Sequence, residues 1–411
     1  MKRLFVFAFS CALAAQTPEP LTIDQAVAEA VKNNLDVAAA RYGISVAEAK
    51  QITASLRPNP VLTISANHLD LLGTGYRGDN NAGPNEFAAH TDFILERGQK
   101  RAARMELAAA ERTVSQLLFE DALRRLVLDA ETAFVDAQAA REALKLAEDN
   151  LRSLNGVVEV NRARVDSGDL AVVELNRSRV AVSQLQTTVR QAQLQFAQAK
   201  KKLQLLLGRA GDLEIAGELR KGPGPADLGS IREAALKQRP DLALIRQQQA
   251  RNRADLRLQL AQGKVDWTVG TEYVRQDASG GHGNSVGLTF STPLPVFNRN
   301  QGEVARSQQE IAQAGALVKA LEARIGNEAA VAWEQFTSSG QQVAEMEKDL
   351  LTRAREVRST MEYSYRRGEA TLVEFLDAQR AFNDTVQSYN AARADYARSL
   401  YVIDAAMAAP R

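Results

Sequence analysis

The most informative absences in this 411-residue sequence are those of cysteine, aromatic residues and long apolar segments. Cys11 is the only cysteine, so no disulfide can form within the chain. Aromatic residues make up 6% of the sequence, while alanine, glutamine, arginine, leucine and glutamate fill long stretches, as in extended helices packed side by side. No segment after residue 15 approaches the roughly 20 apolar residues of a transmembrane helix. With 51 basic against 50 acidic residues, the chain also lacks a basic nucleic-acid-binding signature.

Motifs for catalysis and for metal binding are missing as well. The histidines His68, His90 and His282 have neither an H-E-x-x-H pattern nor cysteine partners, which argues against a zinc or catalytic metal site. Residues 73–78 fit G-x-G-x-x-G, but they lie in a loop between two expected strands, so we interpret them as a flexible turn. The sequence has no nucleophile elbow and no P-loop. We therefore expect no enzyme activity and no cofactor.

The N-terminus has the pattern of a secretory signal peptide. Two basic residues are followed by an apolar run over residues 4–9 and by small residues up to Ala15. We predict that residues 1–15 form the signal peptide and that Cys11 is removed with it. Lipid attachment to Cys11 is the alternative, although the residues before it make a poor lipobox.

The chain repeats itself about 200 residues further along. Residues 165–178 resemble residues 365–378, and residues 30–37 resemble residues 235–242. In the first pair the matching positions are Gly168 and Gly368, Val173 and Val373, and Glu174 and Glu374. A duplication of this length predicts two structurally similar halves, and it favours a pseudo-symmetric body over an enzyme cleft.

Two long segments of the first half show the heptad spacing of packed helices. Residues 98–153 contain no proline, and their only glycine is Gly98. Small or apolar residues recur at alternating steps of three and four over residues 126–151 and 175–206, before Gly208. The same spacing recurs, more loosely, over residues 318–336 and 372–389. We predict helices of roughly 55 to 60 residues, which need neighbours along their whole length; a plain two-stranded coiled coil is the simpler alternative.

Each half also contains a pair of expected strands. The first pair is residues 61–67 and 87–95; in the second, apolar and polar residues alternate over 265–273 and 286–291. Such alternation is typical of membrane-barrel strands around a watery lumen. Four strands cannot close a barrel, for which eight is the usual minimum, so three chains would supply twelve. Otherwise the hairpins pack elsewhere as pieces of a sandwich.

The order of these elements resembles that of the TolC-like outer-membrane efflux channels over nearly the whole chain after the signal peptide. The resemblance is carried by residues 21–26 (L-T-I-D-Q-A) and 33–35 (N-N-L), and by the segments around Gly168 and Gly368. Residues 293–303, P-L-P-V-F-N-R-N-Q-G-E, resemble the subgroup that serves heavy-metal efflux pumps of the cobalt–zinc–cadmium type.

The resemblance implies a mainly α fold with a small β part. Long coiled-coil-like helices would form an α-barrel, and two β-hairpins would contribute four strands to a trimeric 12-stranded outer-membrane β-barrel. The domain division that follows is a signal peptide (1–15), a first repeat (16–210, with a hairpin at 61–95 and long helices over 98–208), a linker (211–229), and a second repeat (230–411, with a hairpin at 265–292 and long helices over 300–408).

A periplasmic gate is a further implication of the resemblance. Gly168 and Gly368 would form the helical tips on which an adaptor protein docks, and the constriction would be lined by Glu174, Tyr365, Glu374 and Asp377. Family members often place an arginine two residues after the second glycine; here Ala370 stands there, and Arg366 or Arg367 could replace it. Three copies of Glu174, Glu374 and Asp377 around one axis would make a narrow passage favour cations. The simpler interpretation of these three residues is that they are solvated acids near a helix N-terminus.

We therefore expect a passive exit duct of a tripartite efflux system for heavy-metal cations or drugs. The chain would form a homotrimer. Its other partners would be a periplasmic adaptor protein, an inner-membrane pump of the RND type and outer-membrane lipid, but no nucleic acid. The alternatives are a type I protein secretion duct and a periplasmic coiled-coil scaffold without a pore.

Overall fold

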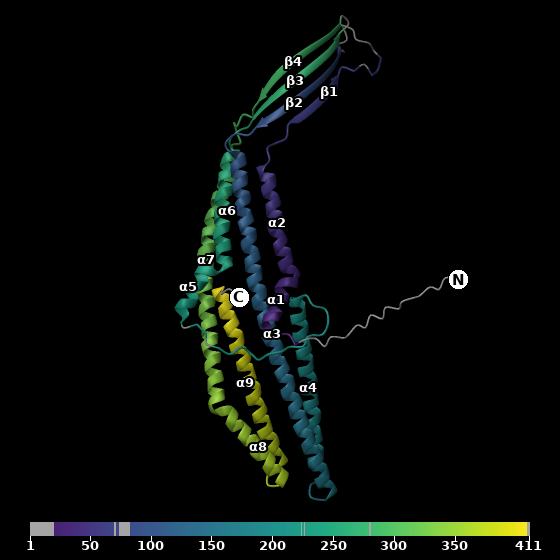
Figure 1. Cartoon of the computed structure of the whole chain (residues 1–411), viewed down its shortest axis with the longest axis vertical. Helices are drawn as coiled ribbons and strands as arrows, with labels where there is room; N and C mark the ends of the chain where they lie inside the picture. Colours follow the sequence, from purple (N-terminus) through teal and green to yellow (C-terminus); the bar gives the residue numbers. More distant parts are fainter. Residues whose placement is uncertain are drawn as a thin grey trace, which may run out of the picture. The chain divides into compact units, whose positions relative to one another are not determined.

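A computed structural model describes residues 20–69, 71–73, 83–222, 224–225, 227–278 and 281–408. The expected signal peptide with Cys11 lies outside these residues, as does most of the G-x-G-x-x-G turn. The helices of the first half are α1 (Ile23–Asn33), α2 (Leu35–Ser55), α3 (Lys100–Asp166) and α4 (Val172–Leu207) (Figure 1). Those of the second half are α5 (Leu228–Gln238), α6 (Pro240–Gln262), α7 (Gln301–Glu345), the π-helix η1 (Met346–Leu350), α8 (Leu351–Arg367) and α9 (Leu372–Met407).

The internal duplication is visible as pairs of equal helices. Helices α1 and α5 each have 11 residues, and α4 and α9 each have 36. Both short helices begin at a polar residue that accepts a hydrogen bond from the first turn, Thr22 in α1 and Asp227 in α5. Helix α4 ends at Gly208, as predicted, because glycine adopts the left-handed conformation there with φ of 60°.

Helix α3 is longer than expected, with 67 residues. The heptad spacing predicts a row of small and apolar residues over 126–151, and every residue of this row is buried or half-buried. The same is true of the row over 175–206 in α4. The expected heptad packing is therefore confirmed in both helices. Among the described residues, no helix is long and apolar enough to cross a membrane.

The described chain divides into two compact units, and each draws on both halves of the sequence. Unit 1 comprises the chain up to Ala38 together with residues 122–239 and 325 onward; unit 2 comprises residues 39–121 and 240–324. The sequence repeats and the spatial units are thus different divisions of the chain, and the repeat boundaries stay a prediction.

Unit 2 contains one antiparallel sheet in the order β1-β2-β3-β4, which confirms both expected hairpins (Figure 1). The strands are β1 (Val61–Asn67), β2 (Asn85–Leu95), β3 (Trp267–Ala278) and β4 (Gly281–Ser291). The register places Val269 opposite Phe290 and Tyr273 opposite Val286, so apolar residues share one face. The other face carries polar residues, with His90 opposite Glu272. Val286 on the apolar face is 78% exposed, so no described residue covers it.

Candidate functional site

The two helical tips of unit 1 are the turns that join α3 to α4 and α8 to α9. Gly168 and Gly368 adopt nearly the same left-handed conformation, with φ of 84° and 81°. The bonding pattern is also shared, because the amide of Asp169 donates to the Arg164 carbonyl at 2.8 Å and that of Glu369 to the Ser364 carbonyl at 2.9 Å. Such bonds cap the final carbonyls of a helix, so both helices end for the same local reason.

The two helices that leave the tips begin differently. At the start of α9, the Glu374 amide donates to Thr371 Oγ1 at 3.3 Å, and the Glu374 carboxylate accepts from the Thr371 amide at 2.8 Å. This capping box holds the pKa of Glu374 below its ordinary value, chiefly through the backbone hydrogen bond from Thr371. At the start of α4 the cap is Ala171, which has no side-chain bond, and Glu174 instead pairs with Arg177 at 2.7 Å.

Helices α3 and α4 form one helical hairpin, and α8 and α9 form a second. Tyr365 lies in the contact between these two helical hairpins rather than on the surface of the tip. Its side chain is buried, with 3% exposed, and its hydroxyl donates to Asn161 Oδ1 of α3 at 2.6 Å. The ring stacks on Phe375 of α9, with centroids 5.5 Å apart. Burial raises the pKa of Tyr365, so the phenol stays protonated and keeps this hydrogen bond.

An apolar cluster surrounds Tyr365 and joins the hairpins near their tips. It contains Leu154 and Val157 of α3 and Leu372 and Phe375 of α9, all buried. Further from the tips, Gln379 of α9 donates to Asn150 of α3 at 3.1 Å. The contact between α3 and α9 therefore alternates between apolar packing and buried polar pairs.

The remaining predicted site residues lie on the surface. Arg366 pairs with Glu362 of its own helix at 2.8 Å, and Arg367 lies over the Tyr363 ring at 4.8 Å. Asp377 is exposed and makes no hydrogen bond or ion pair with another described residue. The tip thus brings Tyr365 to Asn161, but within this chain it brings neither arginine to Glu174, Glu374 or Asp377.

The sequence reasoning did not identify Asn161 and Arg164 of α3. Arg164 donates to the Tyr365 carbonyl at 3.4 Å, and a Cβ atom at Gly368 would lie 2.9 Å from its Nη2. A signal was present, because Leu154, Val157, Asn161 and Arg164 follow one another at steps of three, four and three. A polar residue on an otherwise apolar seam marks a specific partner across the helix contact.

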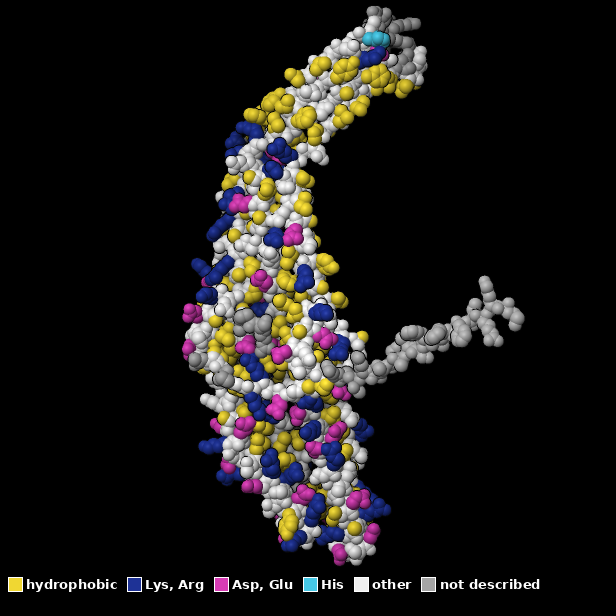
Figure 2. All heavy atoms as spheres, viewed as in Figure 1, with side chains coloured by type: hydrophobic (Ala, Val, Ile, Leu, Met, Phe, Trp, Pro, Cys, Tyr) yellow, Lys and Arg dark blue, Asp and Glu magenta, His cyan; other side chains and the backbone are white. Residues whose placement is uncertain are grey.

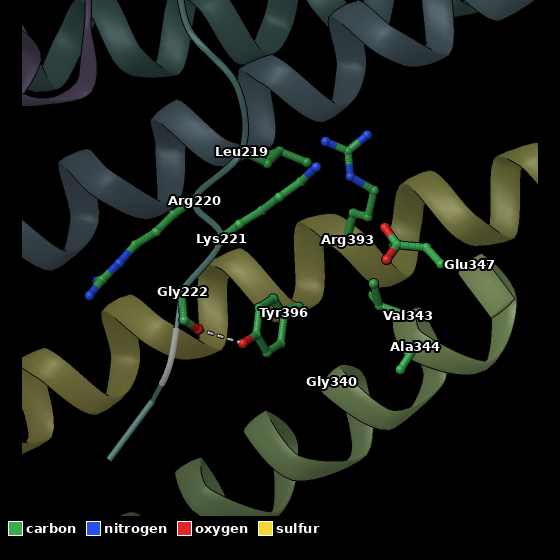
Figure 3. A pocket seen from close by; sticks show the side chains of 10 residues that line it. All are labelled: Leu219, Arg220, Lys221, Gly222, Gly340, Val343, Ala344, Glu347, Arg393 and Tyr396. Atoms are coloured by element: carbon green, nitrogen blue, oxygen red, sulfur yellow. Dashed lines mark hydrogen bonds between the residues drawn. The ribbon is translucent and has the colours of Figure 1, made fainter. Parts of the chain in front are cut away.

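A cleft of about 240 Å³ opens elsewhere in unit 1 (Figure 3). It is lined by residues 219–222 of the linker, by α7 and η1, and by α9. Tyr396 donates to the Gly222 carbonyl at 2.7 Å, and Tyr389 donates to Glu347 of η1 at 2.6 Å. These bonds fasten the linker and the π-helix to α9. In the described part of the chain no group of three or more acidic, histidine or cysteine side chains could hold a metal ion.

Replacing Gly368 by alanine is expected to destabilise the second tip by roughly 1–2 kcal/mol, because a Cβ atom is strained at φ of 81° and approaches Arg164. The matched control is Gly156→Ala in α3, where a Cβ meets nothing within 4 Å and the residue is helical. The control should instead gain about 0.5–1 kcal/mol. Hydrogen exchange of the tip amides measures both changes, and equal effects of the two substitutions would contradict the conformational role of Gly368.

Comparison with known proteins finds a family model and relatives that match most of this chain. The family model described as outer membrane efflux protein matches residues 26–209 and 231–409. The cobalt-zinc-cadmium resistance protein CzcC of Cupriavidus metallidurans is 22% identical over 364 residues, which are 88% of this chain and 84% of that protein. The nickel-cobalt-cadmium resistance protein NccC of Alcaligenes xylosoxydans is 28% identical over 339 residues, 80% of this chain and 73% of that protein.

A solved structure agrees on the fold. The Campylobacter jejuni CmeC outer membrane channel aligns with a TM-score of 0.78 at 14% identity, over 94% of this chain and 85% of that one.

Proposed function

The chain belongs to the outer membrane efflux protein family, and on this premise we propose that three copies of it form a passive exit duct, whose helical tips constrict the periplasmic end. The protein is an outer-membrane efflux channel with a helical periplasmic extension.

The observation that carries the proposal is the sheet with two open edges. Strands β1 and β4 are its outer strands, and no described strand pairs with their outer sides. In a sheet of four antiparallel strands the two edge strands run in opposite directions, so β4 of one copy can pair antiparallel with β1 of the next. Three copies would close a barrel of twelve strands and leave no edge exposed. The apolar face of the sheet would then contact lipid, and the polar face with His90 and Glu272 would line the lumen.

The helical tips are the parts that we assign to partner binding. Two hairpin turns with the same left-handed glycine, Gly168 and Gly368, lie side by side in unit 1, because Arg164 of one tip contacts Tyr365 of the other. Three copies would present six such turns, in two alternating kinds. We assign to them the docking of a periplasmic adaptor protein, which connects the duct to an inner-membrane pump of the RND type.

The gate that we assign to the tips is acidic. Position 370, where family members often carry an arginine, is an alanine here, so no arginine at that position can pair with the acids. Glu374 is exposed and held by its capping box, Glu174 pairs with Arg177, and Asp377 has no described partner. With three copies around one axis, Glu374 and Asp377 would form a ring of negative charge in a narrow aqueous passage. Arg366 and Arg367 remain near their own helix, so any closing salt bridge they form would have to reach a neighbouring copy.

Heavy-metal cations are the cargo that we assign to the duct. The support is that relatives matched over most of this chain are resistance proteins for cobalt, zinc, cadmium and nickel. An acidic constriction suits such ions as well, because like-charged carboxylates attract cations. Deleting the gene from its host should lower resistance to cobalt, zinc and cadmium, and restoring it should recover that resistance. Unchanged resistance to all of these metals, with loss of resistance to organic drugs, would reverse the cargo assignment.

Neutralising both acids of the second tip, Glu374→Gln with Asp377→Asn, is expected to reduce the cation preference of the reconstituted channel. Reversal potentials across a salt gradient measure this preference directly. Because hydrogen bonds keep the pKa of Glu374 low, its charge persists as the pH falls through the ordinary range of a glutamate, and is lost only below it. The wild-type preference should therefore survive mild acidification.

The matched control is Glu356→Gln with Asp384→Asn, two exposed acids of α8 and α9 that do not belong to the proposed ring and form no ion pair with a described residue. This control should leave the reversal potential close to that of the wild type. An equal loss in both variants would show that net charge, rather than a ring at the tips, sets selectivity.

The assembly itself can be tested on the purified protein. We expect a heat-modifiable trimer that extracts with the outer membrane and conducts ions across planar bilayers. A stable monomer without conductance would refute the duct and favour a scaffold role.

A further inference from the structure

The four segments that connect helices to strands in unit 2 meet at one end of the sheet. We call them the strand–helix junction: residues 55–60, 95–104, 262–267 and 292–301. The register places the start of β1 opposite Asp92, the end of β2 opposite the start of β3, and the end of β4 opposite Thr268, so all four segments leave the sheet at the same end.

Positive charge dominates the strand–helix junction. It holds seven basic residues, Arg57, Arg97, Lys100, Arg101, Arg104, Lys264 and Arg299, but only two acids, Glu96 and Asp266. Both acids are already neutralised, because Arg104 pairs with Glu96 and Lys100 pairs with Asp266. The other five basic residues are exposed and form no ion pair with a described residue. Figure 2 shows Lys and Arg side chains gathered where the strands meet the helices.

Large apolar side chains are exposed beside these charges. Phe297 is 90% exposed and Leu294 is 80% exposed, on the segment that follows β4. The segment is not loose, because Asn300 donates to the Gln259 carbonyl at 2.9 Å and Arg299 donates to the Pro295 carbonyl at 3.2 Å. A fastened loop that presents two large apolar groups indicates a surface with an apolar partner.

Trp267 links the charged and apolar parts. The Arg97 guanidinium lies 4.1 Å from the centre of the Trp267 ring, and the ring packs edge-on against Phe290 at 6.0 Å. Phe290 belongs to the apolar face of the sheet, so Arg97 sits at the margin of that face. A tryptophan at the boundary between apolar residues and cations is typical of the level of lipid headgroups in a membrane.

We propose that the strand–helix junction binds anionic phospholipids in the leaflet that faces the periplasm. Arg97 and Arg299 contact the phosphates, and Leu294 and Phe297 lie among the adjacent acyl chains. This rests on the proposed function, because it requires the apolar sheet face to lie in the membrane. Two arguments select a lipid as the occupant. The excess of five basic residues complements phosphate. The exposed apolar residues of 292–301 also follow β4 directly in the chain, so they extend the apolar face of the sheet.

The experiment compares lipids retained by the trimer in detergent, measured by native mass spectrometry after exposure to equal amounts of phosphatidylglycerol and phosphatidylcholine. The wild type should retain phosphatidylglycerol preferentially. Arg97→Gln with Arg299→Gln should reduce this preference by roughly fivefold for each cation removed. A second variant, Arg57→Gln with Lys264→Gln, should act in the same direction. Both side chains are exposed and donate no hydrogen bond to a described residue, so we expect this variant to keep the fold.

The matched control is Lys319→Gln with Arg324→Gln, which removes two exposed charges of α7 outside the junction. It should keep the wild-type lipid preference. Equal retention of phosphatidylglycerol by the control and both junction variants would overturn the proposal. Dissociation of the junction variants into monomers would overturn it as well, because it would identify the surface as a contact between copies.

A failed duct gives a different result from a failed lipid site. If the wild type neither forms trimers nor conducts ions, the proposed function is wrong. If it forms conducting trimers that retain both lipids equally, only the lipid site is wrong.

Discussion

Replacing Phe375 by alanine is expected to loosen the second helical tip by about 3–5 kcal/mol, the usual cost of removing a buried phenylalanine. Phe375 is 1% exposed, stacks on Tyr365 and belongs to the cluster that joins α9 to α3. Without its ring, Tyr365 loses the aromatic stacking that helps to hold its side chain. The free energy of local opening, measured by hydrogen exchange of the amides in α8 and the start of α9, should fall accordingly.

The control for this substitution is Val373→Ala, two residues earlier in the same helix. Val373 is 62% exposed, so its truncation should change the local opening free energy by at most about 0.5 kcal/mol. In bilayers, Phe375→Ala should also raise the conductance of the channel, because the tip that we propose as its constriction is less firmly held. Unchanged exchange protection in the Phe375 variant would show that the cluster does not hold the tip.

Replacing Tyr365 by phenylalanine is the second change with a large expected effect. It keeps the ring that stacks on Phe375 but removes the hydroxyl that donates to Asn161, and it leaves a buried amide oxygen without a partner. Such an unpaired buried group costs about 1–3 kcal/mol. The local opening free energy should fall by that amount, and the channel should spend more time in conducting states.

The double variant Tyr365→Phe with Asn161→Leu separates the hydrogen bond from the packing. Because Asn161 is fully buried, replacing both partners by apolar groups removes the unpaired amide as well as the bond. The double variant should therefore recover part of the protection lost in Tyr365→Phe. A loss equal to the sum of the two single losses would mean that the residues act independently.

The helices and strands could be predicted because each follows from local sequence. Gly208 ends α4 since glycine tolerates the left-handed conformation, and the heptad spacing of α3 and α4 selects the buried side of each helix. The alternation over 265–273 likewise identified β3, because successive side chains of a strand point to opposite faces. In each case the cause lies within a few residues of the effect.

The partners at the tips could not be predicted in the same way. Arg366 and Arg367 were candidates for a salt bridge with the gate acids, but Arg366 pairs with Glu362 one turn earlier in its own helix. A pair four residues apart on a helix is already close, so the local partner wins over a distant one. Tyr365 was expected to line the constriction, and the structure places its side chain in the contact between the hairpins. Its gate role stays a prediction.

The sequence by itself determined the duplicated order of helices and hairpins, the positions of the two turns at Gly168 and Gly368, and the apolar and polar faces of β3 and β4. Only the tertiary structure decided that Tyr365 meets Asn161, that Arg164 reaches the opposite tip, and that five unpaired basic residues gather at one end of the sheet. The reason is physical. Backbone conformation and periodicity are local properties, whereas these contacts join residues up to about 200 positions apart, and they depend on how far one helix is shifted and rotated against another.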